Sequence, residues 1–139
     1  MFFVKDEDVI DVKVFCRKIG HRYVSRTEKE FGKLEEKEED KKKYECLSAK
    51  MRELTWELYN DLQESALVSD GDGERQFNFK LYKENRIMQL LKEWDAKNDD
   101  GKPIPINKVS IAHLAPSVAE AILRAYDEIS FISEEEEGK

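Results

Sequence analysis

The chain contains few residues of the types that usually carry chemistry. His21 and His113 lie far apart in the sequence, and neither has cysteine or carboxylate partners at the spacing of a metal site. We therefore expect both histidines to be surface or packing residues. Cys16 and Cys46 match no thiol-exchange motif, so we expect both to be reduced and structural.

The segment from Asp70 to Gly73 has the Asp-x-Asp-Gly pattern with which some calcium-binding loops begin. An EF-hand loop starting at Asp70 would need a glycine at its sixth position and a bidentate glutamate at its twelfth. These positions hold Arg75 and Leu81. We interpret Gly71 and Gly73 as turn residues and predict no metal site.

The remaining candidates for catalysis are also weak. The chain has no phosphate-cradling glycine loop, no nucleophile elbow and no Cys-His arrangement in a catalytic context. Asp99 and Asp100 share a predicted turn, which lacks the burial that tunes a catalytic carboxylate. We therefore predict that the chain is not an enzyme and uses no cofactor.

The length and composition limit the classes of protein to be considered. The 139 residues are 40% hydrophobic, which suits one domain with a modest core, and the net charge of −7 repels nucleic acid. There is no signal peptide, and no apolar run approaches the roughly 18 residues of a membrane span. We expect a cytosolic protein that binds neither nucleic acid nor membrane.

The N-terminal half is predicted to be a short hairpin followed by helices. Residues 10–16 alternate between apolar and polar side chains, which indicates a strand, and pairing with residues 2–4 would form a β-hairpin over about residues 2–17. Ser25 and Glu28 have the spacing of a capping box at a helix start. A helical stripe then comprises Tyr44, Leu47, Met51, Leu54, Leu58 and Leu62. The charge run at 35–43 is either a solvated turn or bridge, or an exposed face for a partner.

The C-terminal half is predicted to be helical on both sides of a proline-containing turn. A helix capped by Asn78 should run to Trp94 and form the centre of the domain. Asn107 should cap a short helix, and Pro116 should begin an amphipathic helix whose buried stripe comprises Val118, Ile122, Ala125, Ile129 and Ile132. Residues 133–139 are rich in glutamate, and we expect a disordered acidic tail.

These patterns together predict a mainly α fold. We expect residues 1–132 to form a single, compact helical domain of about four to five helices with a short N-terminal β-hairpin. The aromatic residues expected to frame either the core or a groove for a client protein are Trp56, Tyr59, Phe77, Phe79, Trp94 and Tyr126.

The stretch from Leu90 to Ile132 has a recognisable order of residues, which comprises Trp94, Asp99, Gly101, Lys102, Pro103, Ile104, Pro105, Leu114, Pro116, Val118, Ala121, Ala125 and Tyr126. In this order the stretch resembles the C-terminal half of tail assembly chaperones from long-tailed bacteriophages. Members of this family usually have a more extended N-terminal β region, whereas residues 24–66 of this chain are predicted to be almost wholly helical.

The resemblance implies a function in the cytoplasm of the infected bacterial host. Proteins of this kind bind the tape measure protein, keep it soluble, recruit tail tube subunits and are absent from the mature virion. Two alternatives stay open: a structural virion adaptor of the neck or baseplate, whose hairpin would join a neighbouring subunit's sheet, and a host-directed protein-binding module. Assembly into a homo-oligomer is also left open.

Overall fold

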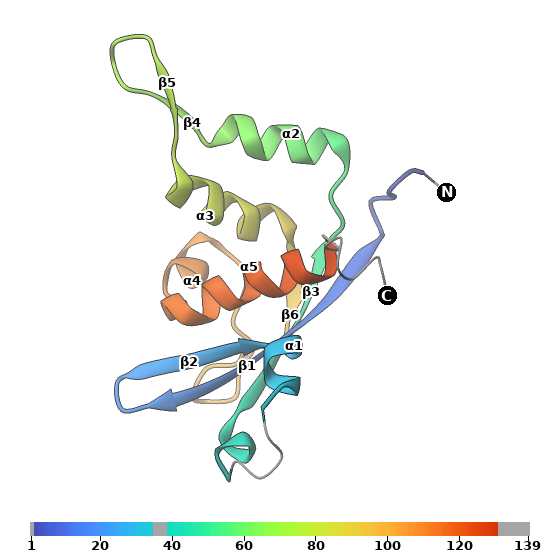
Figure 1. Ribbon diagram of the computed structural model, residues 1–139, viewed down its shortest axis with the longest axis vertical. Coiled ribbons are helices and arrows are strands. Elements are labelled where there is room, and N and C mark those ends of the chain that lie inside the picture. The colour runs from blue at the N-terminus through green and yellow to red at the C-terminus, as the bar shows by residue number, and fades with distance from the viewer. Residues whose placement is uncertain (1, 35–38, 131–139) are drawn as a thin grey trace.

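The centre of the molecule is a four-stranded antiparallel sheet (Figure 1). The computed structural model describes residues 2–34 and 39–130. The strands, in their order across the sheet, are β2 (Arg22–Thr27), β1 (Val9–Ile19), β3 (Glu45–Arg52) and β6 (Leu91–Trp94). A separate two-stranded hairpin consists of β4 (Leu67–Ser69) and β5 (Arg75–Phe77).

The helices are α1 (Glu28–Gly32), the 3₁₀ helix η1 (Glu39–Lys43), α2 (Trp56–Ser65), α3 (Phe79–Leu90), α4 (Lys108–Ala112) and α5 (Pro116–Ser130). Helices α3, α4 and α5 cover one face of the sheet, and α2 lies beyond α3, whereas Phe31 of α1 stacks on Phe15 of β1 on the other face, with 4.0 Å between the ring centroids. Helix α5 packs against β1 and β2, and α2 packs on α3. The β4–β5 hairpin joins α2 to α3 and projects away from the sheet (Figure 1).

The prediction of a mainly α fold is wrong. Among the described residues 41% are helical and 30% are extended, so the fold is mixed α/β. The largest error lies in the helix expected from Tyr44 to Leu62, because residues 45–52 form β3 and only the later part forms α2. Leu47 and Met51 are four residues apart, which fits a helix, but with Ala49 between them they also have the period of a strand.

The N-terminal strand was correctly predicted but its partner was not. β1 pairs with β2 on one side and β3 on the other, while residues 2–4 lie outside the sheet, so the hairpin at about 2–17 is wrong. The capping box lies two residues later than predicted. Thr27 Oγ1 accepts from the Glu30 N–H at 3.2 Å, and the Thr27 N–H donates to Glu30 Oε1 at 2.9 Å, because Ser25 is still part of β2.

The central helix was correctly started and wrongly ended. Asn78 caps α3 as expected, but the helix ends at Leu90, and residues 91–94 join the edge of β3 as β6. The short helix capped by Asn107 and the start of α5 at Pro116 are confirmed. Residues 133–139 and 35–38 lie outside the described part of the chain, and residues 39–43 of the charge run form η1.

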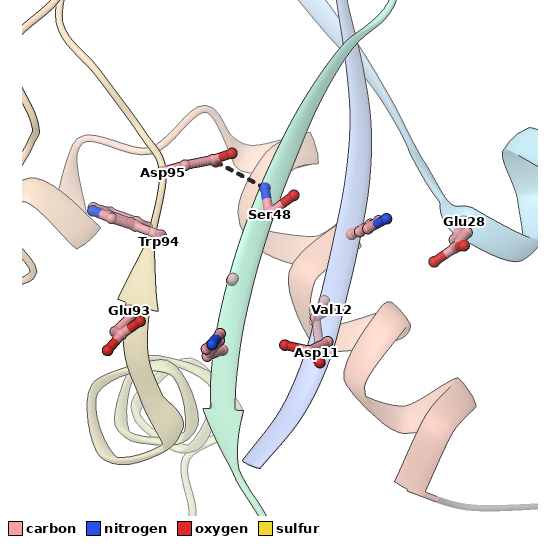
Figure 2. Close-up of a pocket in the computed structure, with 10 residues that line it drawn as sticks. Asp11, Val12, Glu28, Ser48, Glu93, Trp94 and Asp95 are labelled. Carbon is pink, nitrogen blue, oxygen red and sulfur yellow. Dashed lines mark hydrogen bonds between the residues drawn. The ribbon is translucent and has the colours of Figure 1, made fainter.

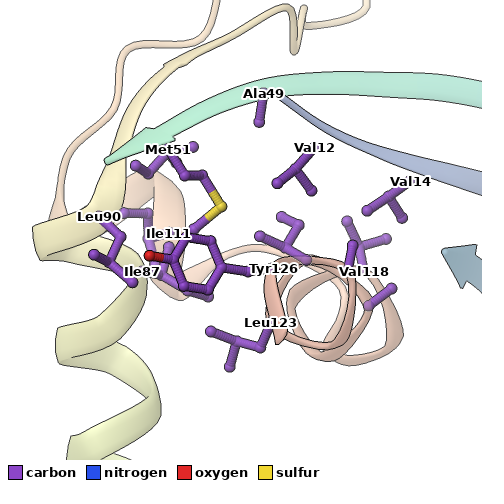
Figure 3. Packing of buried hydrophobic residues seen from close by; sticks show 14 of the residues in the cluster. Val12, Val14, Ala49, Met51, Ile87, Leu90, Ile111, Val118, Leu123 and Tyr126 are labelled. Atoms are coloured by element: carbon purple, nitrogen blue, oxygen red, sulfur yellow. The ribbon is translucent and has the colours of Figure 1, made fainter. Parts of the chain in front are cut away.

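The core lies between the inner face of the sheet and helices α3, α4 and α5. Figure 3 shows Ala49 and Met51 of β3 and Val12 and Val14 of β1 directed toward Tyr126 and its neighbours on α5. The largest side chains that are fully buried are Tyr126, Met51, Leu90, Ile122, Val12 and Val14. In the stripe predicted on the last helix, Val118, Ile122 and Ala125 are buried, whereas Ile129 is 49% exposed and Ile132 lies outside the described residues.

An ion pair between a buried arginine and a half-exposed aspartate links α3 to α5. Arg86 is 9% exposed and pairs with Asp127, and its guanidinium carbon lies 5.6 Å from the ring centroid of Tyr82 and 5.9 Å from that of Tyr126. Because an arginine placed this deep needs a counter-charge, the pair fixes how the two helices approach each other.

Helix α5 also covers the outer edge of β2. Ser117 Oγ donates to the Tyr23 carbonyl at 2.7 Å, and Arg124 Nη2 donates to the Ser25 carbonyl at 3.4 Å. Arg124 also binds the Glu30 carboxylate, and this hydrogen bond lowers the pKa of Glu30. These contacts occupy backbone acceptors that an added strand would use, so β2 is a poor edge for pairing with another chain.

Trp94 holds the loop that follows the sheet, and this contact gives a first prediction. Its indole N–H donates to the Ile104 carbonyl at 2.7 Å, and the Ile104 N–H donates to the Ala96 carbonyl at 2.9 Å. Trp94→Phe should lower the free energy of unfolding by about 1–3 kcal/mol, because the carbonyl loses its donor. Urea unfolding followed by circular dichroism would measure this. Trp56→Phe is the control, and equal stabilities of the two variants would contradict the structural role of Trp94.

Candidate functional site

Three of the aromatic residues singled out from the sequence meet at one end of the sheet. Trp56, Tyr59 and Tyr126 line a pocket of about 550 Å³, which lies where β1 begins, β3 and α5 end and α2 begins. We call it the aromatic pocket. Its other lining residues are Val4, Ile10, Glu53, Leu54, Thr55, Ile129 and Ser130.

Local structure fixes the position of each aromatic side chain in the pocket. Thr55 caps α2 by accepting from the Leu58 N–H at 3.1 Å, which places Trp56 on the first helical residue and Tyr59 one turn later. Leu58 faces inward and is buried. Trp56 and Tyr59 therefore lie on the side of α2 that does not pack into the core.

Tyr126 forms the floor of the pocket and belongs to the core. It is fully buried, and its hydroxyl donates to the Arg52 carbonyl at 2.8 Å. Burial raises the pKa of the Tyr126 phenol, because the charged form would lose its hydration. With its hydroxyl already engaged, Tyr126 supports the rim and is not free to bind a polar group of a partner.

The rim of the pocket is apolar and open to solvent. Trp56 is 68% exposed, Tyr59 46% and Ile129 49%, and Phe2 and Phe3, each 87% exposed, directly precede Val4 of the lining. Among the described residues that line the pocket, only Glu53 is charged. Large exposed aromatic groups around an apolar hollow are typical of a surface that binds another protein.

The other aromatic candidates lie elsewhere. Phe77 and Phe79 contact each other at 4.9 Å between ring centroids, and Phe77 contacts Tyr82 at 5.2 Å, so this group joins the β4–β5 hairpin to α3. Phe79 is nevertheless 70% exposed. The six candidates therefore divide into the aromatic pocket, the base of the hairpin and the loop held by Trp94.

The outer face of the sheet carries several carboxylates. Figure 2 shows Asp11 on β1 and Glu93 on β6, with β3 between these two strands, Asp95 just after the end of β6, and Glu28 set apart on α1. Lys50 lies between Asp11 and Glu93 in the cross-strand register, and Asp95 accepts from the Ser48 N–H at 2.8 Å. Within residues 2–34 and 39–130, no three metal-ligating side chains gather in one place. This face is the polar side of the strand alternation.

Val4 and Ile129 line the pocket but are not among the site residues predicted from the sequence. The sequence predicts Val4 in a strand and Ile129 in the buried stripe of the last helix. Ile129 follows Tyr126 by three residues, so its side of the helix was predictable. No local signal shows that the core ends before it reaches Ile129.

Comparisons with models of protein families, with curated proteins and with solved structures gave no match. None of the helices in the described part of the chain combines the length and the apolar character that crossing a bilayer requires. The proposal for the function is therefore based on the residues of the aromatic pocket.

Proposed function

We propose that this chain is a non-catalytic protein-binding module that holds an apolar stretch of a client protein at the aromatic pocket. The observation that carries this proposal is the exposure of Trp56 and Tyr59 beside Ile129, around a hollow whose described lining residues are mostly apolar. Tryptophan and tyrosine commonly dominate the binding energy of protein interfaces, because they bury a large area with few rotatable bonds.

We further propose the specific role of a phage tail assembly chaperone in the cytoplasm of the infected host. Its clients would be the tape measure protein, which it would keep soluble, and tail tube subunits, which it would recruit. The resemblance over Leu90–Ile132 supports this role. Strands β1, β2 and β3 add support, because they form an extended N-terminal β region of the kind usual in that family. The net charge of −7 would help to keep a complex with an apolar client in solution.

The test is co-expression of this protein with the tape measure protein of the same phage, followed by size exclusion and light scattering. The wild type should solubilise the client in a defined complex. Trp56→Ala combined with Tyr59→Ala should weaken that complex at least about 30-fold, the effect of losing one or two dominant interface residues. Phe79→Ala, which removes an equally exposed ring away from the pocket, is the matched control.

Two results would count against the proposal. Full solubilisation by the Trp56 and Tyr59 double variant would exclude the aromatic pocket as the client site. An insoluble client, together with stable presence of this protein in purified particles, would replace the chaperone by the structural adaptor.

A further inference from the structure

A second hollow lies at the opposite end of α5 from the aromatic pocket. It has a volume of about 720 Å³ and lies between α3, α4 and α5, and we call it the α3–α5 groove. Its apolar lining residues are Leu81, Ile87, Met88, Ile111, Ala112, Leu114, Pro116, Ala119 and Leu123. The two hollows share no lining residue, although Leu123 of one and Tyr126 of the other lie within one turn of each other on α5, so they are distinct but neighbouring sites.

The groove exists because small residues face a larger apolar floor. Ala112 and Ala119 leave space opposite α3. The floor is continuous with the core, since Ile87, Ile111 and Leu123 are each less than one-tenth exposed. Apolar surface of this kind gains free energy when a partner covers it.

The shape and lining of the groove fit a helix better than a small molecule. Lining residues occur on α3 from Lys80 to Gln89, a length of about 13 Å, which accommodates the i, i+3/i+4 and i+7 side chains of a bound helix. Gln89 is exposed at the rim, and the half-buried Asn85 already donates its amide N–H to Ser65 Oγ at 2.9 Å. The floor thus lacks the converging polar groups that orient a small ligand.

The charged side chains at the rim indicate the charge that a partner segment should carry. Lys83 pairs with Glu120 across the groove at 2.8 Å, and Lys80 lies 3.9 Å from Glu84. The third lysine of the lining, Lys108, has no carboxylate within salt-bridge distance among the residues that the structure describes. On a chain with a net charge of −7, this rim carries a local positive surplus.

We infer that the α3–α5 groove binds an amphipathic helix of a partner protein, with its apolar stripe on the groove floor and an acidic residue facing Lys108. The site is independent of the aromatic pocket, so the chain can hold two segments at once. Simultaneous binding of two segments of one client would raise the overall affinity without any new contact.

The probe is an 18-residue labelled peptide with leucines at i, i+3, i+4 and i+7 and glutamates on either side, compared with the same peptide carrying lysines. Fluorescence anisotropy should show tighter binding of the acidic peptide. Lys108→Glu should weaken the acidic peptide about five-fold and strengthen the basic one. Ala112→Trp, at an exposed position, should fill the groove and weaken both at least about ten-fold.

The outcomes separate this inference from the proposed function. Binding that Lys108→Glu and Ala112→Trp leave unchanged, or no binding of either peptide, would overturn the groove assignment, whatever the Trp56 variants do to the client. Peptide binding should in turn be unaffected by Trp56→Ala. A concentration-dependent dimer that Ala112→Trp abolishes would show that the occupant is a second copy of this chain, which also overturns the assignment to a partner helix.

Discussion

Tyr126→Ala is expected to lower the free energy of unfolding by about 3–5 kcal/mol, the usual cost of removing a large buried aromatic side chain. Tyr126, on α5, has no exposed surface, and its side chain lies between the sheet and α3. The Arg86 guanidinium carbon is 5.9 Å from the centroid of its ring. Its removal would leave a cavity and would remove the ring that packs against Arg86 of the ion pair with Asp127. Urea unfolding monitored by circular dichroism is the measurement.

Tyr126→Phe separates the ring from its hydroxyl. This variant keeps the packing but loses the 2.8 Å hydrogen bond to the Arg52 carbonyl, and it should cost about 1–2 kcal/mol. Tyr59→Ala, at a tyrosine that is 46% exposed, is the control and should cost less than about 1 kcal/mol. A larger loss for Tyr59→Ala than for Tyr126→Ala would contradict the assignment of Tyr126 to the core.

The raised pKa of Tyr126 makes the stability of the folded protein depend on pH, and it fixes the direction of this dependence. The folded state keeps the phenol protonated to a higher pH than the unfolded state, in which tyrosine ionises near pH 10. The stability contributed by the neutral phenol is therefore fully present below about pH 10 and is lost as the pH rises further. The stability difference between wild type and Tyr126→Phe should therefore shrink as the pH rises above about 10. A constant difference across this range would contradict the burial of the hydroxyl.

Ala49→Asp should be nearly as damaging, with a loss of more than about 3 kcal/mol, because it places an unpaired carboxylate in the core. Ala49 is 5% exposed and faces the inner side of the sheet between Leu47 and Met51. In the helix predicted from Tyr44, by contrast, Ala49 would lie opposite the apolar stripe and would face solvent. The variant therefore tests directly whether residues 45–52 form a strand.

The matched control places the same aspartate on the other face of the same strand. Cys46 is exposed, and Cys46→Asp should change the stability by less than about 1 kcal/mol. Thermal and urea unfolding of both variants would give the comparison. Equal, small losses would mean that Ala49 is exposed and that the sheet is not formed as described.

Elements whose signals lie within a few neighbouring residues could be predicted from the sequence. The caps at Asn78 and Asn107, the start of α5 at Pro116 and the turn glycines Gly71 and Gly73, with φ of 93° and 89°, all follow from local backbone chemistry. The stripe of α5 was also predictable, because its apolar residues recur at steps of three and four.

The aromatic composition of the candidate site could be predicted, but its location could not. The sequence makes Trp56 and Tyr59 candidates for a client groove, because they lie on a second side of their predicted helix. Tyr126, Trp94 and Phe77 are equally good candidates by sequence alone. Only the packing of α5 on the sheet buries Tyr126 and leaves Trp56 at the rim. The α3–α5 groove had no sequence signal, because it arises where small residues of α4 and α5 meet α3.

The sequence by itself determined where the helices of the C-terminal half begin and which side of α5 is buried. Tertiary structure alone decided that residues 45–52 and 91–94 are strands. β3 lies between β1 and β6, so its backbone bonds are made with residues about 40 positions away in both directions, and no local pattern records such partners. The apolar residues from Leu47 to Met51 fit both the helical and the strand period. In such a segment, the presence of a neighbouring strand to pair with decides the structure.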